Sequence, residues 1–238
     1  MKKFHQELHE ELYGNYPKQL VAVDNVIFGY DEGELKVLLY PRSFEPERGN
    51  WSLLGGFLQS EESSEEAATR IVNLTTGLSD LYMEQVQTFT NPAREEKTRV
   101  LSIVYYTLIR LAKYDDTLLQ QYGAEWFSLD DLPELIFDHA EMIELALTKL
   151  RQKASIRLMG SELLDDKFTI SQLRRLYGAI YDKELDPGNF RKKVLSLGVL
   201  VRLDKKDFEE SKKGAYYYRY EEEETENEKE IIKVINFI

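Results

Sequence analysis

The fold of this chain is decided by residues 51 to 78, WSLLGGFLQSEESSEEAATRIVNLTTGL. Two glycines, Gly55 and Gly56, turn the chain between a short apolar run and a polar segment that leads into a helical pattern. Ser63 and Glu66 have the spacing of a capping box, which predicts that a helix begins there. At helical spacing, the apolar positions form one stripe that we expect to be buried: Ala67, Ile71, Leu74 and Leu78.

The stretch resembles the signature box of the Nudix family, which normally hydrolyses nucleoside diphosphates linked to another group. That box runs Gly, five residues, Glu, seven residues, and then Arg-Glu-hydrophobic-X-Glu-Glu-X-Gly-hydrophobic. The positions that match at the right spacing are Gly56, Glu62, Arg70, Val72, Gly77 and Leu78. The three glutamates of the helical part are missing, because Ile71, Leu74 and Thr75 stand in their places.

The missing glutamates decide the expected chemistry. Mg²⁺ prefers oxygen ligands, and a bound metal neutralises the pyrophosphate and helps to activate a water. The resemblance therefore implies a Nudix fold without hydrolysis: a protein that is not an enzyme and needs no metal or other cofactor. Other glutamates remain as alternative metal ligands, although near a helix start they are expected to complement the helix dipole: Glu61, Glu62, Glu65 and Glu66.

The composition is that of an ordinary globular chain, with 42% hydrophobic and 31% charged residues among 238. This length fits one large domain or two small ones. The absence of cysteine excludes disulfides and thiolate metal sites, and three histidines, His5, His9 and His139, argue against a multi-histidine site. The sequence shows no secretory signal and no run long enough to span a membrane, so we expect a cytoplasmic protein without a membrane partner.

The formal net charge of −12 argues at first sight against nucleic acid as a partner. A local patch nevertheless sets the local field, so the distribution of charge matters more than its total. Much of the acidity lies around residue 62, at 130–131 and at 221–224, whereas basic residues cluster in the second half of the chain.

Elements around the box alternate between strands and helices. Strand patterns cover residues 20–30, 35–40, 82–90, 100–109 and a short stretch at 126–127, and helical patterns cover 4–13 and 139–153. Residues 41–50 are polar and contain prolines, which predicts a loop. Together with the resemblance, this order predicts an α/β (α+β) chain that begins with a Nudix-like α/β/α sandwich, an effector-binding domain over residues 1–150.

A pocket of this domain would need a few convergent polar groups beside an aromatic platform. The candidate ligand-binding residues around the former active site are Tyr40, Arg42, Trp51, Gly55, Gly56, Asn91, Arg94 and Glu95. Two alternatives stay open. Tyr40 and Trp51 could be core aromatics, and Arg42 and Arg94 could recognise a phosphate, which would favour a nucleotide ligand.

Residues 151–238 have the pattern of a winged helix. A helix over 168–180 starts at a cap, Thr169 or Ser171, and Pro187 stands at the first position of a second helix that Gly198 ends. Strands at 199–203 and 215–220 would form the wing. The candidate DNA-binding residues are Arg174, Arg175, Asn189, Arg191, Lys192, Lys193, Lys205, Lys206, Lys212 and Lys213.

The candidate DNA contacts have distinct expected roles. Asn189, Arg191, Lys192 and Lys193 would face outward from the N-terminal half of the second helix, which helix-turn-helix proteins present to the major groove. Asn and Arg can read adenine and guanine edges, and the lysines near the wing would contact phosphates. A basic helix by itself is usually only a solvated face, but here it lies in a two-helix, two-strand pattern.

A Nudix-like domain followed by a winged helix resembles the Nudix-related transcriptional regulators, over nearly the whole chain. The resemblance implies a ligand-responsive, sequence-specific repressor of sugar catabolism that binds a palindromic operator of double-stranded DNA as a homodimer. Some members of that family answer to ADP-ribose-type nucleotides. The lost glutamates favour the arabinose-responsive AraR branch, with L-arabinose as the effector. Two rival functions are a Nudix hydrolase of a nucleoside diphosphate sugar such as ADP-ribose, and a protein-interaction module.

Overall fold

The computed structural model describes residues 13–31, 33–78, 81–95, 98–111, 121–161, 163–208 and 212–221. Three predicted features fall outside these residues, apart from single end residues: the helix at 4–13, the acidic run at 221–230 and the C-terminal IIKVINFI. His5 and His9 lie outside them as well. Among the described residues no helix is long and apolar enough to cross a membrane.

The first domain is built on a mixed sheet of seven strands. The strands are β1 (Leu20–Asp31), β2 (Glu34–Pro41), β3 (Trp51–Ser52), β4 (Leu54–Phe57), β5 (Met83–Phe89), β6 (Val100–Arg110) and β7 (Glu125–Ser128). The path through the sheet runs β3-β2-β1-β6-β5, with β4 paired to β1 and β7 paired to β2. The long β1–β6 pair is parallel, and the other pairs are antiparallel.

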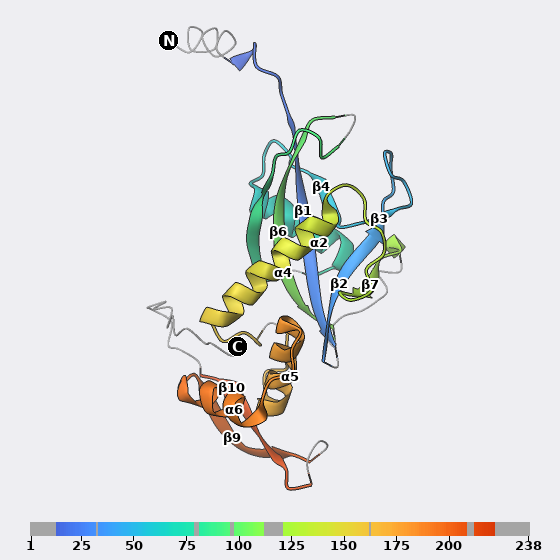
Figure 1. The fold of residues 1–238 in the computed structure, drawn as a ribbon. Coiled ribbons are helices and arrows are strands. Elements are labelled where there is room, and N and C mark those ends of the chain that lie inside the picture. Colours follow the sequence, from blue (N-terminus) through green and yellow to red (C-terminus); the bar gives the residue numbers. More distant parts are fainter. Residues whose placement is uncertain are drawn as a thin grey trace, which may run out of the picture.

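Helices cover both faces of this sheet. Successive side chains of a strand point to opposite faces, so apolar residues of β1 contribute to a core on each face. On β1, Val23 and Ile27 belong to the core that α2 (Ser64–Thr76) covers. Val26 and Phe28 belong to the core that α4 (His139–Ile156) covers. Figure 1 shows the sheet between its helices, so the predicted α/β/α sandwich is confirmed.

The helix of the box begins as predicted, and Ala67 and Ile71 of the predicted stripe are buried. Ser63 accepts from the amide of Glu66 and Glu66 accepts from the amide of Ser63, which completes the capping box. Leu74 was expected in the buried stripe, but it is 58% exposed. The Leu74 side chain points away from the middle of the buried face of α2, which consists of Ala67, Ala68, Ile71, Val72 and Thr76.

The second domain is the predicted winged helix. It contains β8 (Phe168–Thr169), α5 (Ile170–Tyr181), α6 (Pro187–Ser196), β9 (Leu200–Asp207) and β10 (Ala215–Tyr220), with a sheet order of β8-β10-β9. Thr169 caps α5 in a capping box with Gln172, and Asp186 caps α6 just before Pro187. These short polar signals explain why the sequence located both helices.

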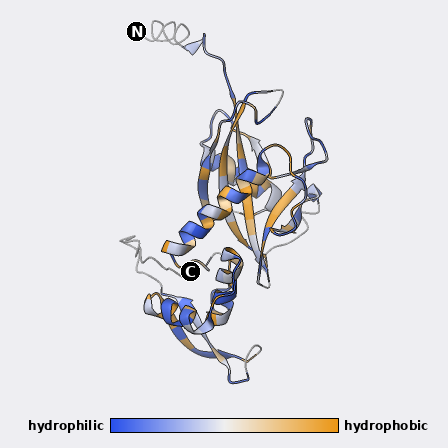
Figure 2. Cartoon of the chain, viewed as in Figure 1, coloured by the Kyte–Doolittle hydropathy of each residue, from blue (hydrophilic) through white to orange (hydrophobic). Residues whose placement is uncertain are grey.

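The two domains share one apolar core through α4. The buried cluster that contains Val26 of β1 continues through Leu150 and Ala154 of α4 to Leu173 and Leu176 of α5. Figure 1 shows α4 running from the sheet toward the winged helix, and Figure 2 shows apolar residues on the elements that meet there. The boundary at residue 150 stays a prediction, and α4 runs across it.

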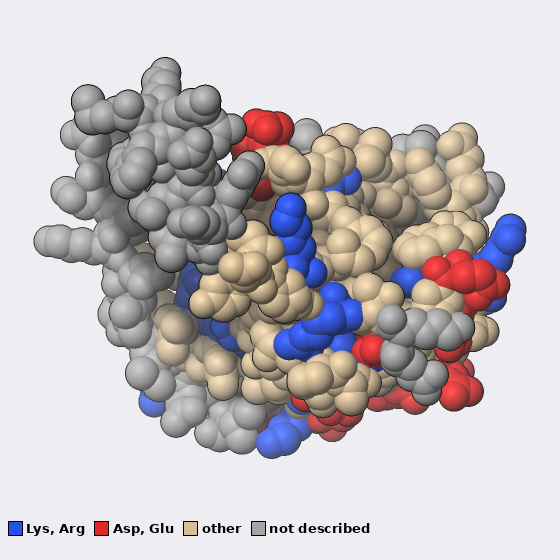
Figure 3. Space-filling view, turned by 90° about the horizontal axis from the view of Figure 1, so that it is seen from above, with Lys and Arg blue, Asp and Glu red and all other residues tan. Residues whose placement is uncertain are grey.

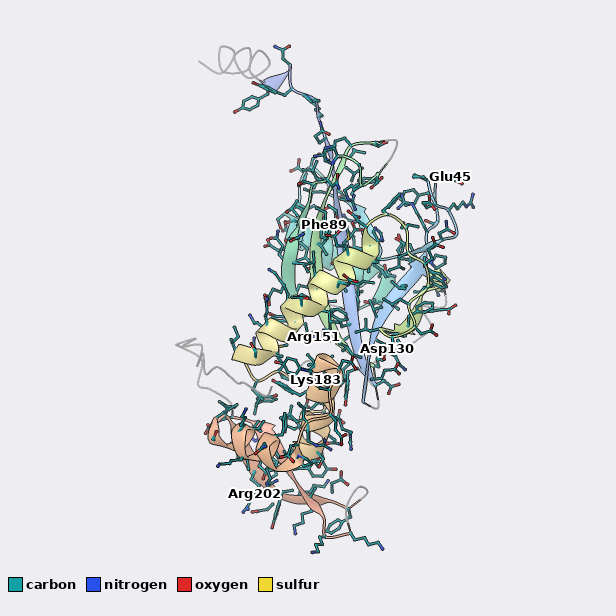
Figure 4. All side chains as sticks on the ribbon, viewed as in Figure 1. Glu45, Phe89, Asp130, Arg151, Lys183 and Arg202 are labelled. Atoms are coloured by element: carbon teal, nitrogen blue, oxygen red, sulfur yellow. The ribbon has the colours of Figure 1, made fainter. Side chains whose placement is uncertain are left out.

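Hydrogen bonds reinforce this junction. The Arg151 Nε–H donates to the carbonyl of Ile180 at 2.7 Å, and the Tyr181 hydroxyl donates to the carbonyl of Arg151 at 3.2 Å. In Figure 4, Arg151 and Lys183 lie on the two sides of the junction. A change in the direction of α4 would therefore be transmitted to α5.

Candidate functional site

A polar pocket lies at the end of the sheet that is farther from the winged helix, where β2 and β5 end and α4 begins. It consists of a narrow cavity of about 40 Å³ and a wider one of about 690 Å³, which share Arg94 and Phe137. The narrow cavity contains six predicted residues: Tyr40, Arg42, Gly55, Gly56, Arg94 and Glu95. Asn91 lines the wider cavity beside Arg94. Figure 3 looks onto this end of the molecule and shows basic side chains gathered near its middle.

Trp51 does not line either cavity and packs against the core, as in the alternative that the sequence left open. Its ring packs edge-on against Phe127 with 4.8 Å between ring centroids, and its carbonyl accepts from the amide of Ile136. Besides the predicted Tyr40, the rings of Phe44 and Phe137 line the narrow cavity, with the Arg42 guanidinium 4.0 Å and 5.3 Å from their ring centroids. Phe44 lies in a polar loop, and its sequence carried no signal for this role.

Arg94 is a buried part of the pocket wall, with a side chain only 2% exposed. Its Nε–H and Nη2–H donate to the two carboxylate oxygens of Asp138 at 2.9 and 2.8 Å, and its Nη1–H donates to Glu95 at 3.1 Å. Burial alone would lower the pKa of Arg94, but Asp138 in particular raises it overall. Burial raises the pKa of Glu95. Since Arg94 already holds two carboxylates, Arg42 is the more available guanidinium for a phosphate.

His139, which sequence reasoning left without a role, closes the pocket at the start of α4. It is 3% exposed, and its Nδ1 accepts from the amide of Leu53 at 3.1 Å. The Ser52 hydroxyl lies 3.5 Å from the same nitrogen. Burial lowers the pKa of His139, so the folded protein holds a neutral ring with its proton on Nε2.

This neutral histidine predicts a loss of stability in mild acid. The pKa of His139 lies below 6.5 in the folded protein and near 6.5 in the unfolded chain. As pH falls through 6.5, the unfolded chain therefore binds a proton that the folded protein does not, and the folded state loses free energy relative to it. We expect His139→Gln to flatten the dependence of the free energy of unfolding between about pH 7.5 and 5.5, measured by urea denaturation. An unchanged slope would contradict a buried neutral ring.

The positions of the missing glutamates do not fit a magnesium site. Ile71 is buried, Leu74 is exposed, and the Thr75 hydroxyl donates to the carbonyl of Ile71. Glu62 is engaged by Arg70 at 2.7 and 2.8 Å, and that hydrogen bond lowers the pKa of Glu62. Among the described residues no group of three or more His, Cys, Asp or Glu side chains could hold a metal ion.

The second candidate surface is α6 with the wing. Phe190 and Val194 anchor α6 in the core, which leaves four predicted residues exposed on its other side: Asn189, Arg191, Lys192 and Lys193. The amide of Asn189 bonds the cap carboxylate of Asp186 at 2.7 Å. Arg191 Nη2–H donates to the hydroxyl of Tyr218 at 3.3 Å, which ties the helix to β10.

The wing carries more basic groups than the sequence indicated. Lys205 and Lys206 lie within β9 and not in the predicted loop, while Lys212 and Lys213 are exposed after it. Arg202 and Lys206 both lie 4.6 Å from the centroid of the Tyr216 ring. Lys167 approaches Tyr217 and also Lys205, and its contact lowers the pKa of Lys205. Lys167 and Arg202 were missed because neither lies next to another basic residue in the sequence.

Arg174 and Arg175 lie on α5 and not on α6 or the wing, and their backbone contacts to DNA stay a prediction. Both line a cleft of about 410 Å³ that faces Gly33 in the turn between β1 and β2. Arg174 donates to the carbonyl of Leu185 at 3.0 Å and so holds the turn between α5 and α6.

The fold and the pocket define a Nudix protein, and residues 18–146 match the NUDIX domain family, to which this chain belongs. The particular kind follows from the second domain, because residues 160–220 match the NrtR DNA-binding winged helix domain. This match confirms the regulator architecture expected from the sequence. It does not support the AraR branch.

Three relatives extend over large parts of the chain. The ADPR responsive transcriptional repressor NtrR of Acinetobacter baylyi is 29% identical over 210 residues, which cover 87% of this chain and 84% of the relative. The ADP-ribose pyrophosphatase of Methanocaldococcus jannaschii is 33% identical over 146 residues, 60% of this chain and 82% of the relative. The structure of Shewanella oneidensis NrtR with a 27mer DNA is similar with a TM-score of 0.77 at 29% identity, covering 84% of this chain and 93% of that chain.

Proposed function

We propose that this protein is an ADP-ribose-responsive transcriptional repressor that binds double-stranded DNA through α6 and the wing. The proposal rests on the combination of two features in one chain: a polar pocket in the Nudix domain and an exposed basic helix in the NrtR-type domain. Two relatives are named for ADP-ribose, one as a repressor and one as a pyrophosphatase. Arabinose, the effector expected from the sequence, has no support in these relatives, and ADP-ribose replaces it.

Helix α4 provides the route from effector to DNA. Its first residues, Asp138 to Glu141, lie at the pocket, and its last turns pack on α5. A ligand that binds two orientations of α4 with different affinity shifts the population of the two. The shift would change the separation or tilt of the two α6 helices of a homodimer, whose half-sites lie about one helical turn apart. By linkage, operator DNA must change the affinity for ADP-ribose by the same factor.

Fluorescence anisotropy with duplex DNA from the gene's own neighbourhood tests the proposal. We expect binding to one palindromic site that weakens steeply with salt, because each phosphate contact releases counterions. ADP-ribose should weaken the complex and L-arabinose should leave it unchanged. Failure to bind any duplex specifically would overturn the DNA-binding function. A response to arabinose alone would overturn the effector.

The alternative function is hydrolysis of ADP-ribose, which the pyrophosphatase relative keeps open. The same samples, supplied with Mg²⁺, distinguish the two functions if ADP-ribose is followed by chromatography. We expect ADP-ribose to stay intact over the time of the anisotropy measurement, because Ile71, Leu74 and Thr75 offer no carboxylate. Mg²⁺-dependent turnover would favour the hydrolase.

A further inference from the structure

Asp24 is a carboxylate that lines the narrow cavity and was not among the predicted ligand-binding residues. It lies in β1 and is only 6% exposed. Its Oδ2 accepts a short hydrogen bond from the hydroxyl of Ser102 on the neighbouring strand β6. That hydrogen bond satisfies Oδ2 and leaves Oδ1 available to accept from a ligand.

Gly55 leaves the space that Oδ1 occupies. Gly55 lies directly opposite Asp24 in the antiparallel β1–β4 pair. A Cβ built on Gly55 would lie 2.0 Å from Oδ1, which is far inside contact distance. Any other residue at position 55 would therefore displace the carboxylate. The two glycines that open the box thus have a second effect besides the turn, since one of them admits a buried acid to the cavity.

Within the part of the chain that the structure describes, the charge of Arg94 acts on Asp24, but Arg94 does not donate a hydrogen bond to it. Arg94, whose charge is felt at this site, gives its hydrogen bonds to Asp138 and Glu95. A buried carboxylate oxygen that accepts no hydrogen bond is costly, so a ligand that donates to Oδ1 would be stabilised by that hydrogen bond.

We propose that Asp24 accepts hydrogen bonds from a vicinal diol of a ribose in the effector, and so selects ribose-bearing ligands. This assignment rests on the proposed ADP-ribose response. The two arginines at this cavity, Arg42 and Arg94, are already balanced by Asp24 and Glu95, and hydroxyl groups donate to a carboxylate without adding charge. An acidic side chain that accepts a hydrogen bond from a ribose hydroxyl is a recurrent way to recognise ribose. Arg42, stacked between Phe44 and Phe137, is placed for the phosphates.

Isothermal titration calorimetry with two ligands tests the assignment: ADP-ribose, and ADP-ribose whose diols have been cleaved by periodate. Asp24→Asn keeps the shape of the side chain and an acceptor for Ser102, and Asp31→Asn is the matched control at the exposed end of the same strand. Operator binding and the unfolding midpoint report whether each variant is folded.

We expect wild type and Asp31→Asn to lose about 10- to 100-fold in affinity when the diols are cleaved, the loss expected for hydrogen bonds to a charged group. Asp24→Asn should bind intact ADP-ribose about 10- to 100-fold more weakly than wild type, and cleavage should cost it little more. Ser102→Ala keeps the charge but frees the carboxylate, so it should lie between the two.

An Asp24→Asn variant that binds intact ADP-ribose as wild type does would overturn the assignment and leave the proposed function standing. Equal losses on diol cleavage in wild type and Asp24→Asn would overturn it too. If the wild-type protein binds no ADP-ribose, both the proposed effector and the role of Asp24 are overturned.

Discussion

Replacing Asn189, Lys192 and Lys193 together by alanine should weaken operator binding by at least about 100-fold. All three side chains are exposed on the side of α6 that faces away from the core. A lost base contact costs about 1–3 kcal/mol, and each lost phosphate contact lowers the slope of log affinity against log salt by about 1. Anisotropy at several salt concentrations measures both effects.

The variant is designed to remain folded. Phe190 and Val194 keep α6 in the core, and the Asp186 cap bonds a backbone amide that alanine retains. Arg191 is left in place because its bond to Tyr218 holds the helix against the wing sheet. ADP-ribose affinity should be unchanged, since the pocket lies at the other end of the molecule.

Lys183→Ala is the matched control, because this exposed lysine lines the cleft beside α5 and not the surface of α6. It should bind the operator about as well as wild type. Equal losses in the triple variant and in Lys183→Ala would show a general effect of positive charge, and an unaltered triple variant would exclude α6 as the reading helix.

Local signals in the sequence located the starts of the main helices, but not the short strands β3, β4 and β8. The capping boxes at Ser63 and Thr169, and the proline at the start of α6, depend on residues a few positions apart, so they can be read without knowing the fold. The frame of the box likewise placed Gly55 and Gly56 at the pocket. Leu74 was misplaced because the helical period allows neighbouring stripes, and packing chooses between them.

The rest of the pocket depends on contacts between distant parts of the chain. Asp24 meets Ser102 because β1 and β6 pair in parallel, and His139 meets Leu53 because α4 crosses the sheet. No short pattern connects these residues, and Asp24 looks like one polar interruption in an apolar strand. The shared core was also not visible in the sequence, because an amphipathic α4 would look the same if it packed on one domain only.

A carboxylate outside the predicted set should have the largest effect on stability. Asp138→Ala would leave the buried Arg94 guanidinium without its bidentate partner, and breaking a buried ion pair by removing one side costs about 3–5 kcal/mol. Because Glu95 still holds Nη1, we expect the lower end, about 3 kcal/mol. The shift of the urea midpoint at constant slope measures it.

Two further variants distinguish the loss of the buried ion pair from the general effect of removing a carboxylate. Asp166→Ala also removes a partner of an arginine, Arg110, but the Asp166 side chain is 92% exposed and lies 3.5 Å away, so its loss should stay below about 1 kcal/mol. Asp138→Asn keeps an acceptor for Arg94 and should lose less than alanine. Asp138 is the N-cap residue of α4, yet its side chain makes no capping hydrogen bond. A lost cap therefore cannot explain a large effect, and a loss as small as that of Asp166→Ala would mean that Glu95 alone satisfies the buried arginine.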